Sequence, residues 1–371
     1  MTISRRKLLL AGLGVVALGV LLYLFRGILH LRTFSWGKLW DSVRSANPVY
    51  LGASIVCIYA CYAIRALRWQ VFQRNIGAVG FGNIYKMTLA GFSAVFLLGR
   101  AGEPIRPLLL ARKTKHPVAD LFGIWALERL FDLASTAVLA ATALMIFNAH
   151  SPGGEGAGSM QTAAKTAGTF LALGVAVAVV FLLYLRLHGS GMLERRLDKW
   201  LTSATWRGKL ARIVLGFVRG VQTIRTWSDF LLTAIYSAAH WYLVVLIYFL
   251  VAKAFGGQLG NLSIGDNMLI LVFTLVGSAV QLPAVGGGSQ ALTIFAYTKI
   301  FGIESEPAVA AALIVWIVSF AMVSVAGIPL LVGEGISLGN LRTLAKQEKE
   351  ELKEIAAAGA PEDGRPGEMH Q

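Results

Sequence analysis

The chain has 371 residues, of which 56% are hydrophobic and 15% are charged, and its mean hydropathy is +0.64. Soluble domains are about 45–50% apolar and about 25% charged, so the composition excludes an ordinary soluble protein and predicts an all-α polytopic membrane protein. The net charge of +14 does not indicate a nucleic-acid partner, because the basic residues gather at the ends of apolar segments and no nucleic-acid-binding motif accompanies them. Such juxtamembrane bases set orientation and contact anionic lipids.

The first apolar segment, at 8–25, follows SRRKLL, which resembles a twin-arginine export signal. The apolar run is long, no A-x-A cleavage site follows it, and further spans come after it. We therefore expect an uncleaved first span whose Arg5, Arg6 and Lys7 lie in the cytoplasm.

Further apolar segments are long enough, or nearly so, to cross about 30 Å of hydrocarbon. They lie at 49–67, 84–99, 121–147, 166–185, 229–252, 267–282 and 308–332, and a half-length stretch follows at 290–302.

The loops predict the orientation of these segments. Residues 148–165 contain almost no base and are expected outside, whereas the strongly basic loop 186–228 is expected inside. The second span then delivers Arg65, Arg68 and Arg74 to the cytoplasm.

A full crossing by 84–99 would place the basic RKTK sequence outside, against this rule. The conflict disappears if 84–112 is a re-entrant hairpin that breaks at GRAGEP. A second hairpin at 267–302, broken at Pro283 and at Gly286–Gly288, lets the last span return to the cytoplasm. Irregular backbone at that depth is tolerated only inside protein or beside a wet cavity.

The sequence thus predicts about six full spans plus two re-entrant hairpins in the plasma (inner) membrane, with both termini cytoplasmic. The halves, 8–147 and 166–332, each read span, span, hairpin, span, which is typical of an inverted-topology repeat. The alternative is two loosely similar glycine-rich breaks. We expect one membrane domain at 1–335 and a charged cytoplasmic tail at 336–371.

Ionisable residues in a membrane are costly and normally face the protein interior or water, where they find partners. Glu128 and Asp132 share one helix face, and Arg129 reaches Asp132 at i,i+3 spacing. Arg100 and Arg106 flank the first break, with Glu103 between them, and are the nearest bases in sequence.

Two interpretations of this cluster stay open. Its arginines hold a phosphate, which guanidinium groups bind in a bidentate way, or it is a permanent salt-bridge network that clamps the hairpin to the fourth span. Backbone N–H groups at 102–106 and 286–290 would add anion-binding capacity, and Glu103 and Gly287 are expected deep in the bilayer near a common cavity. The predicted substrate-binding residues are Arg100, Glu103, Arg106, Glu128, Arg129, Asp132, Gly286, Gly287, Gly288 and Gln290.

No cofactor or metal is expected. PAVGGGSQA lacks the Gly-Lys-Ser/Thr ending of a nucleotide-binding P-loop. Cys57 and Cys61, one helical turn apart, favour core packing over a disulfide or a metal site. A lone His240 within a span is more typical of a packed residue than of a proton relay.

Four stretches carry a resemblance to a known family: IRALRWQVF (64–72), LLGRAGEPIRPLLLAR (97–112), ALERLFDL (126–133) and LPAVGGGSQA (282–291). Over roughly residues 10–335 the chain resembles the lysylphosphatidylglycerol synthase transmembrane family of flippase-like proteins. Many relatives carry a glutamate just after the second break, where Gln290 stands nearby in this sequence. In bifunctional members this domain precedes a cytosolic aminoacyltransferase domain, for which the sequence after the last span is too short.

The resemblance implies a flippase for a phospholipid or lipid-linked anion rather than an enzyme. Nothing in the sequence binds ATP, so movement would be passive or ion-coupled. An intramembrane enzyme using Glu128 or Asp132 as general acid or base is the alternative, although no nucleophile stands out. A non-transporting scaffold of an envelope lipid or glycan synthesis complex is the third.

Overall fold

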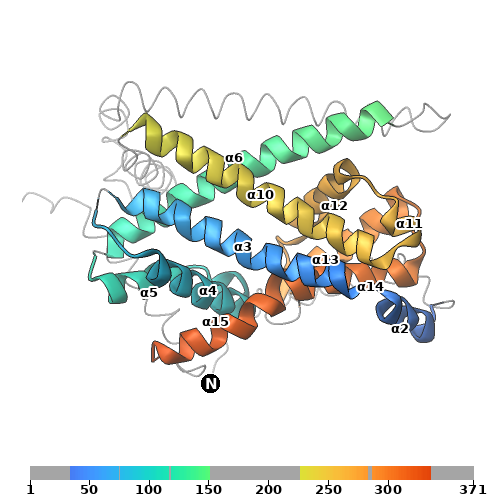
Figure 1. Cartoon of the computed structure of the whole chain (residues 1–371), viewed down its shortest axis with the longest axis horizontal. Coiled ribbons are helices and arrows are strands. Elements are labelled where there is room, and N and C mark those ends of the chain that lie inside the picture. The colour runs from blue at the N-terminus through green and yellow to red at the C-terminus, as the bar shows by residue number, and fades with distance from the viewer. Residues whose placement is uncertain (1–33, 75, 117, 151–225, 283–285, 336–371) are drawn as a thin grey trace, which may run out of the picture.

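The computed structural model describes residues 34–74, 76–116, 118–150, 226–282 and 286–335 (Figure 1). Apart from one pair of two-residue strands, the regular structure in these ranges is helical. Five helices are long and apolar enough to cross a membrane: Pro48–Gln73, Phe81–Leu98, Asp120–Phe147, Trp227–Phe255 and Ser305–Gly333. The prediction of an all-α, multi-pass membrane protein is confirmed.

The helices begin where the sequence supplies caps. α3 (Pro48–Gln73) follows Asn47, whose side chain accepts a hydrogen bond from Val49 N–H at 2.9 Å, and it carries proline at its first position. α10 (Trp227–Phe255) is capped by the Thr226 hydroxyl. α12 (Ile264–Gly277) starts with a reciprocal capping box between Ser263 and Asp266.

The centre of the molecule is an antiparallel pair formed by α3 and α10, which pack along one another (Figure 1). At one end Asn47 N–H donates to Ala254 O at 2.8 Å, and at the other Arg74 Nη1 lies 3.1 Å from Asp229 Oδ1. Each of these contacts joins the start of one helix to the end of the other.

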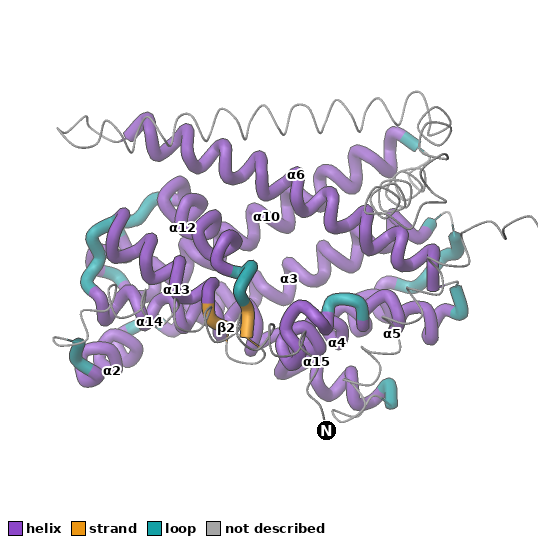
Figure 2. Tube along the Cα trace, turned by 180° about the vertical axis from the view of Figure 1, so that it is seen from behind, coloured by secondary structure: helices purple, strands orange, loops and turns teal. Residues whose placement is uncertain are grey.

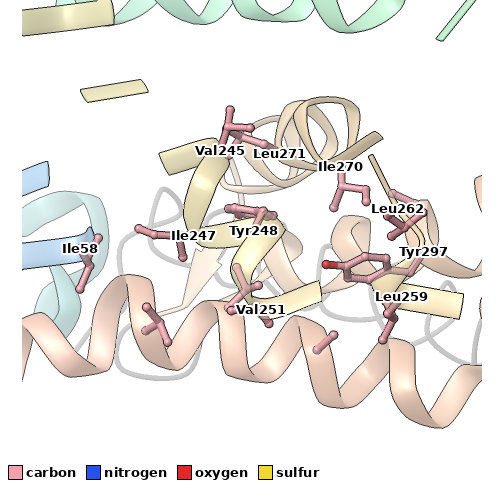
Figure 3. Close-up of a cluster of buried hydrophobic side chains, with 14 of the residues drawn as sticks. Ile58, Val245, Ile247, Tyr248, Val251, Leu259, Leu262, Ile270, Leu271 and Tyr297 are labelled. Carbon is pink, nitrogen blue, oxygen red and sulfur yellow. The ribbon is translucent and has the colours of Figure 1, made fainter. Parts of the chain in front are cut away.

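The largest buried hydrophobic cluster lies along this pair. Figure 3 shows Val245, Tyr248 and Val251 of α10 facing side chains from α12 and from the segments that flank it. Burial of these apolar surfaces holds α12 and the segments that flank it against α10.

The first predicted break is a helical hairpin. α4 (Phe81–Leu98) leads through a 3₁₀ turn (Gly99–Gly102) into α5 (Ile105–Thr114). The arms approach closely: a Cβ on Gly102 would overlap the Ala94 carbonyl of α4. The segments before and after the hairpin also meet, because a Cβ on Gly77 would overlap the His116 ring. The hairpin therefore returns to the end of the bundle from which it started.

The second break is built differently. After α12, strands β1 (Gln281–Leu282) and β2 (Gly286–Gly287) pair antiparallel, and α13 (Gly288–Phe295) continues into a π-helical segment (Ala296–Ile300). Thr274 and Thr293 bridge the arms through their hydroxyls at 2.6 Å. Residues 283–285, including Pro283, lie outside the described ranges. The 3₁₀ turn of the first hairpin contacts β1, and Figure 2 shows the strands between α13 and the α4–α15 pair.

α6 (Val118–His150) follows the first hairpin. The second is followed by α14 (Ser305–Trp316), a π-helical segment (Ile317–Ala321) and α15 (Met322–Gly333). Two shorter helices, α2 (Trp36–Ser45) and α11 (Gly257–Gly260), lie before α3 and after α10.

The apolar segments predicted at 49–67, 84–99, 121–147, 229–252 and 308–332 are confirmed as helices. The segment predicted at 267–282 ends as a helix at Gly277, because the chain turns there into the strand pair. The segments at 8–25 and 166–185, the loop from 186 to 225 and the tail at 336–371 lie outside the described residues.

Candidate functional site

The acids of the predicted cluster lie at the centre of a buried ion-pair network. Glu128, on α6, is fully buried. Its Oε1 accepts hydrogen bonds from Arg65 Nε at 2.7 Å and from Arg68 Nη2 at 2.9 Å. Its Oε2 accepts one from Trp69 Nε1 at 2.8 Å and forms an ion pair with Arg106. Both carboxylate oxygens thus have hydrogen-bond donors and positive partners, which a buried carboxylate needs to stay charged.

Asp132 lies one turn further along α6 and shares the same arginines. Arg68 Nη2 donates to its Oδ1 at 2.8 Å, and Arg65 Nη2 donates to its Oδ2. Arg129 Nη2 lies 3.4 Å from the same Oδ2. The i,i+4 spacing of the acids thus matches the i,i+3 spacing of Arg65 and Arg68 on α3.

The network ties together four helices. Arg68 Nη1 donates to Ser237 Oγ of α10 at 2.9 Å, and Arg106 Nη1 from α5 reaches Glu128 Oε1 at 3.4 Å. Aromatic rings cover the guanidinium groups: Arg106 lies 4.3 Å from the Trp69 ring centroid, and Arg65 lies 4.7 Å from that of Phe92. These cation–π contacts stabilise positive charge away from water.

The described side chains of the cluster do not balance in charge. Four guanidinium groups, those of Arg65, Arg68, Arg106 and Arg129, face three carboxylates, which leaves one positive charge in excess. The buried Nε groups of Arg68 and Arg129 also have no hydrogen-bond acceptor among the described residues. An additional anionic group beside Arg129 would compensate the excess charge.

The network opens at Arg129 and Glu103. Their side chains are 34% and 26% exposed and lie 3.9 Å apart at their nearest charged atoms, whereas the Arg106 side chain is 3% exposed. A cavity of about 40 Å³ lies there, lined by Gly91, Phe92, Val95, Glu103, Arg106, Trp125 and Arg129. One water needs about 10–15 Å³, so this cavity holds a few waters or a few atoms of a polar group.

A larger apolar groove of about 410 Å³ lies between α6 and α10, near the start of α12. Its walls include Phe131, Val138, Phe230 and Val245. Ser237 also lines it and accepts the hydrogen bond from Arg68. The apolar groove therefore borders the charged network.

The glycine-rich part of the predicted site lies apart from this network. Gln290 Oε1 accepts hydrogen bonds from Gly287 N–H at 2.6 Å and from Ser289 Oγ at 3.0 Å. It lines a separate cavity of about 10 Å³ with Ser289, Thr293 and Tyr248 among others. The structure brings the tips of the two hairpins into contact, but these two cavities do not share a residue.

The sequence identified the acids but missed most of their partners. Arg65 and Arg68 were predicted only as bases at the cytoplasmic end of the second span; the side of the membrane stays a prediction, but both side chains are buried in the network, with only 7% and 1% exposed. The signal was their helical spacing with Trp69 on one face of α3. Arg100 lies on the 3₁₀ turn, and its side chain is outside the described part.

The cysteines Cys57 and Cys61 are free thiols. Within the described ranges, no group of three or more His, Cys, Asp and Glu side chains is placed to hold a metal ion.

Comparison with known proteins agrees with the resemblance carried by the sequence motifs. Residues 9–327 match the model of a family described as the lysylphosphatidylglycerol synthase TM region. The match includes α2 to α14 and the first half of α15. The name of the family refers to the membrane region of the synthase, not to a synthase domain. The chain is also 23% identical over 310 residues to a UPF0104 membrane protein of Methanothermobacter thermautotrophicus, covering 79% of this chain and 87% of that protein.

Proposed function

Because the chain belongs to the lysylphosphatidylglycerol synthase transmembrane-region family, we propose that it moves a phospholipid or a lipid-linked anion between the leaflets of the plasma membrane. The observation that carries this proposal is an excess of buried guanidinium charge beside an apolar groove. A lipid has the matching chemistry, since its phosphate is anionic and its chains are apolar.

The arginines of the cluster divide into two groups. Arg65 and Arg68 make short hydrogen bonds to both Glu128 and Asp132, so they form the clamp that holds α3 to α6. Arg106 and Arg129 line the small cavity. Arg129 is the most exposed and has only long ion pairs, of 3.4 to 3.9 Å, so we assign it the first contact with the headgroup.

The clamp and the ligand site therefore coexist in one network. Glu103 pairs with Arg129 when no anion is bound and is displaced when a phosphate arrives. Arg106 stays paired with Glu128, and the rest of its guanidinium group faces the cavity. Bidentate binding by these guanidinium groups would hold the lipid phosphate, and the excess positive charge of the cluster would favour a net anionic headgroup over a zwitterionic one, whose choline cation it repels.

We further propose that both breaks are re-entrant hairpins and that the halves form an inverted repeat. The antiparallel α3–α10 pair supports this, because each hairpin follows the end of one of these helices and so begins at the opposite end of the bundle. One arm of each hairpin also packs against a helix of the other half: α4 packs against α15 of the second half, and α12 packs against α6 of the first. Such a design suits passive or ion-coupled movement by rocking one half against the other.

The orientation follows from the bases at the end where α3 and α5 finish. Arg74, Arg112, Lys113 and Lys115 lie there, and positive residues favour the cytoplasmic side. We therefore place that end, and both chain termini, in the cytoplasm.

The test is leaflet exchange in liposomes that contain the purified protein. Fluorescent phosphatidylglycerol and phosphatidylcholine would be compared for wild type, Arg129→Gln, Arg129→Lys and the control Arg74→Gln. Arg74 lies on the same bundle but its side chain is 56% exposed and paired with Asp229, outside the network. We expect Arg129→Gln to slow exchange of the anionic lipid at least about tenfold, the loss of one charge-assisted hydrogen bond, Arg129→Lys to restore it in part, and Arg74→Gln to leave it unchanged.

Equal exchange by wild type and Arg129→Gln, with both proteins monodisperse, would remove the headgroup role of the cluster. A chemically altered lipid without exchange would favour the intramembrane enzyme. Absence of both exchange and alteration for every lipid would favour the scaffold.

A further inference from the structure

α2 is a short amphipathic helix with two tryptophans on its outer side. Trp36 and Trp40, one turn apart, are 77% and 59% exposed. Leu39 and Val43 are partly buried on the neighbouring side, and α2 packs against α14. Large aromatic side chains left this exposed on one side of a helix mark a contact surface.

Both ends of α2 are fixed to the bundle. Ser35 N–H, at the N-cap, donates to Glu306 Oε1 in the first turn of α14 at 3.1 Å. At the other end Asn47 N–H donates to Ala254 O, the end of α10, at 2.8 Å. Figure 1 shows α2 at this end of the bundle, beside α14.

The position of α2 along the bundle identifies its surroundings. α3, which is long enough to cross a membrane, begins two residues after α2 ends, and α14 begins at the same end. The first turn of a crossing helix lies where hydrocarbon gives way to headgroups. α2 is thus held at the depth of an interface.

We propose that α2 is an in-plane anchor that binds the phospholipid headgroup region of the leaflet in which the second hairpin begins. Trp36 and Trp40 occupy the boundary between headgroups and acyl chains, where amphipathic indole rings gather. Lys38 and Arg44, on the exposed surface, reach lipid phosphates. A helix of this kind buries its apolar face about 5–10 Å into the boundary.

The anchor has a structural consequence for the second hairpin. Glu306, which holds Ser35, comes directly after the hairpin returns through Ile303. The hydrogen bond between Ser35 N–H and Glu306 therefore links the depth of the second hairpin to the position of α2 at the membrane surface. The charged face of α2 stays in the headgroup region, because burying it in hydrocarbon would be costly. α2 therefore fixes how deep the second break, at Gly286 and Gly287, lies in the bilayer.

The test places a fluorescent label on single cysteines at positions 36, 38 and 40 of the full chain, in a Cys57→Ala, Cys61→Ala background. The proteins would be reconstituted in vesicles of phosphatidylcholine and phosphatidylglycerol, with a quencher carried either by the lipid near its glycerol or by the aqueous phase. We expect labels at 36 and 40 to be quenched mainly by the lipid quencher and the label at 38 mainly by the aqueous quencher. The ratio of lipid quenching to aqueous quenching should differ several-fold between the two faces of α2.

Equal aqueous quenching at all three positions would overturn the proposal, and so would labels at 36 and 40 that are shielded from both quenchers, since a second protein copy would then cover them. An independent measurement leaves the cysteines intact. In the Trp36→Phe, Trp40→Phe double variant, the quenching of tryptophan fluorescence by brominated lipid should fall relative to wild type; unchanged quenching would contradict the anchor.

Discussion

At the scale of the residue, the identity of Glu128 controls the network. Its two oxygens receive three arginines and the Trp69 indole. Removal of this carboxylate would leave the buried guanidinium groups of Arg65 and Arg68 without one of their two acidic partners, which is costly away from water. This makes Glu128 a structural residue even though it lies beside the proposed binding cavity.

We expect Glu128→Gln to destabilise the protein by about 3–5 kcal/mol, the range for breaking a buried ion pair. The matched control is Glu103→Gln, which removes a partly exposed acid whose ion pair with Arg129 is 3.9 Å long and should cost less than about 1 kcal/mol. Thermal unfolding in detergent would compare the two. Equal unfolding temperatures would show that the network does not hold the helices together.

The residue scale also shows what the sequence could predict of the site. Glu128, Arg129 and Asp132 were identified because their helical spacing is local. Arg65 and Arg68 were missed because they lie 60 to 67 positions before the acids that they bind, and because bases near the end of a span are normally assigned to water. Ser237 carried no signal, since a serine in an apolar helix commonly bonds its own backbone, as it also does here to Thr233 O.

At the scale of the element, both breaks depend on close approach of backbones. The 3₁₀ turn of the first hairpin packs onto α4 at Gly102, and α12 meets α13 at Gly277 and Gly288. Glycine in the sequence correctly predicted where the described helices break, at Gly99–Gly102 and at Gly286–Gly287, whereas Pro283 lies outside the described residues. The sequence did not predict the strand pair or the π-helical segments, which arise from tertiary contacts without a local sequence pattern.

Gly102→Ala tests the packing of the first hairpin. The added Cβ would overlap the backbone carbonyl of Ala94, which cannot move aside as a side chain would, so we expect a loss of about 1–3 kcal/mol. Gly82→Ala is the control, because a Cβ at this position in α4 meets nothing within 4 Å and alanine favours a helix. If both variants unfold at the wild-type temperature, the arms of the hairpin are more loosely packed than described.

At the scale of the whole molecule, the two halves of the chain pack against each other through several helix pairs. Contacts between the halves run through α3 with α10, α4 with α15, and α6 with α12, and each hairpin also packs against helices of its own half. The sequence predicted where the described helices and breaks lie, whereas the contacts between the halves required the three-dimensional structure.

The proposed inverted repeat predicts which surfaces share a side of the membrane. Asn83 lies in the first turn of α4 and Lys113 in the last turn of α5, at the open end of the first hairpin, whereas Asn261 and Glu304 flank the second. All four are exposed. Single cysteines at these positions, in a background without Cys57 and Cys61, would be labelled with an impermeant maleimide in sealed cells. If both hairpins are re-entrant, as proposed, each leaves by the membrane face through which it entered. We therefore expect Asn261→Cys and Glu304→Cys to react from outside, and Asn83→Cys and Lys113→Cys to react only after the membrane is opened. Reaction of Asn83→Cys and Lys113→Cys from opposite sides would mean that the chain crosses between them, and the first hairpin would then be a full span.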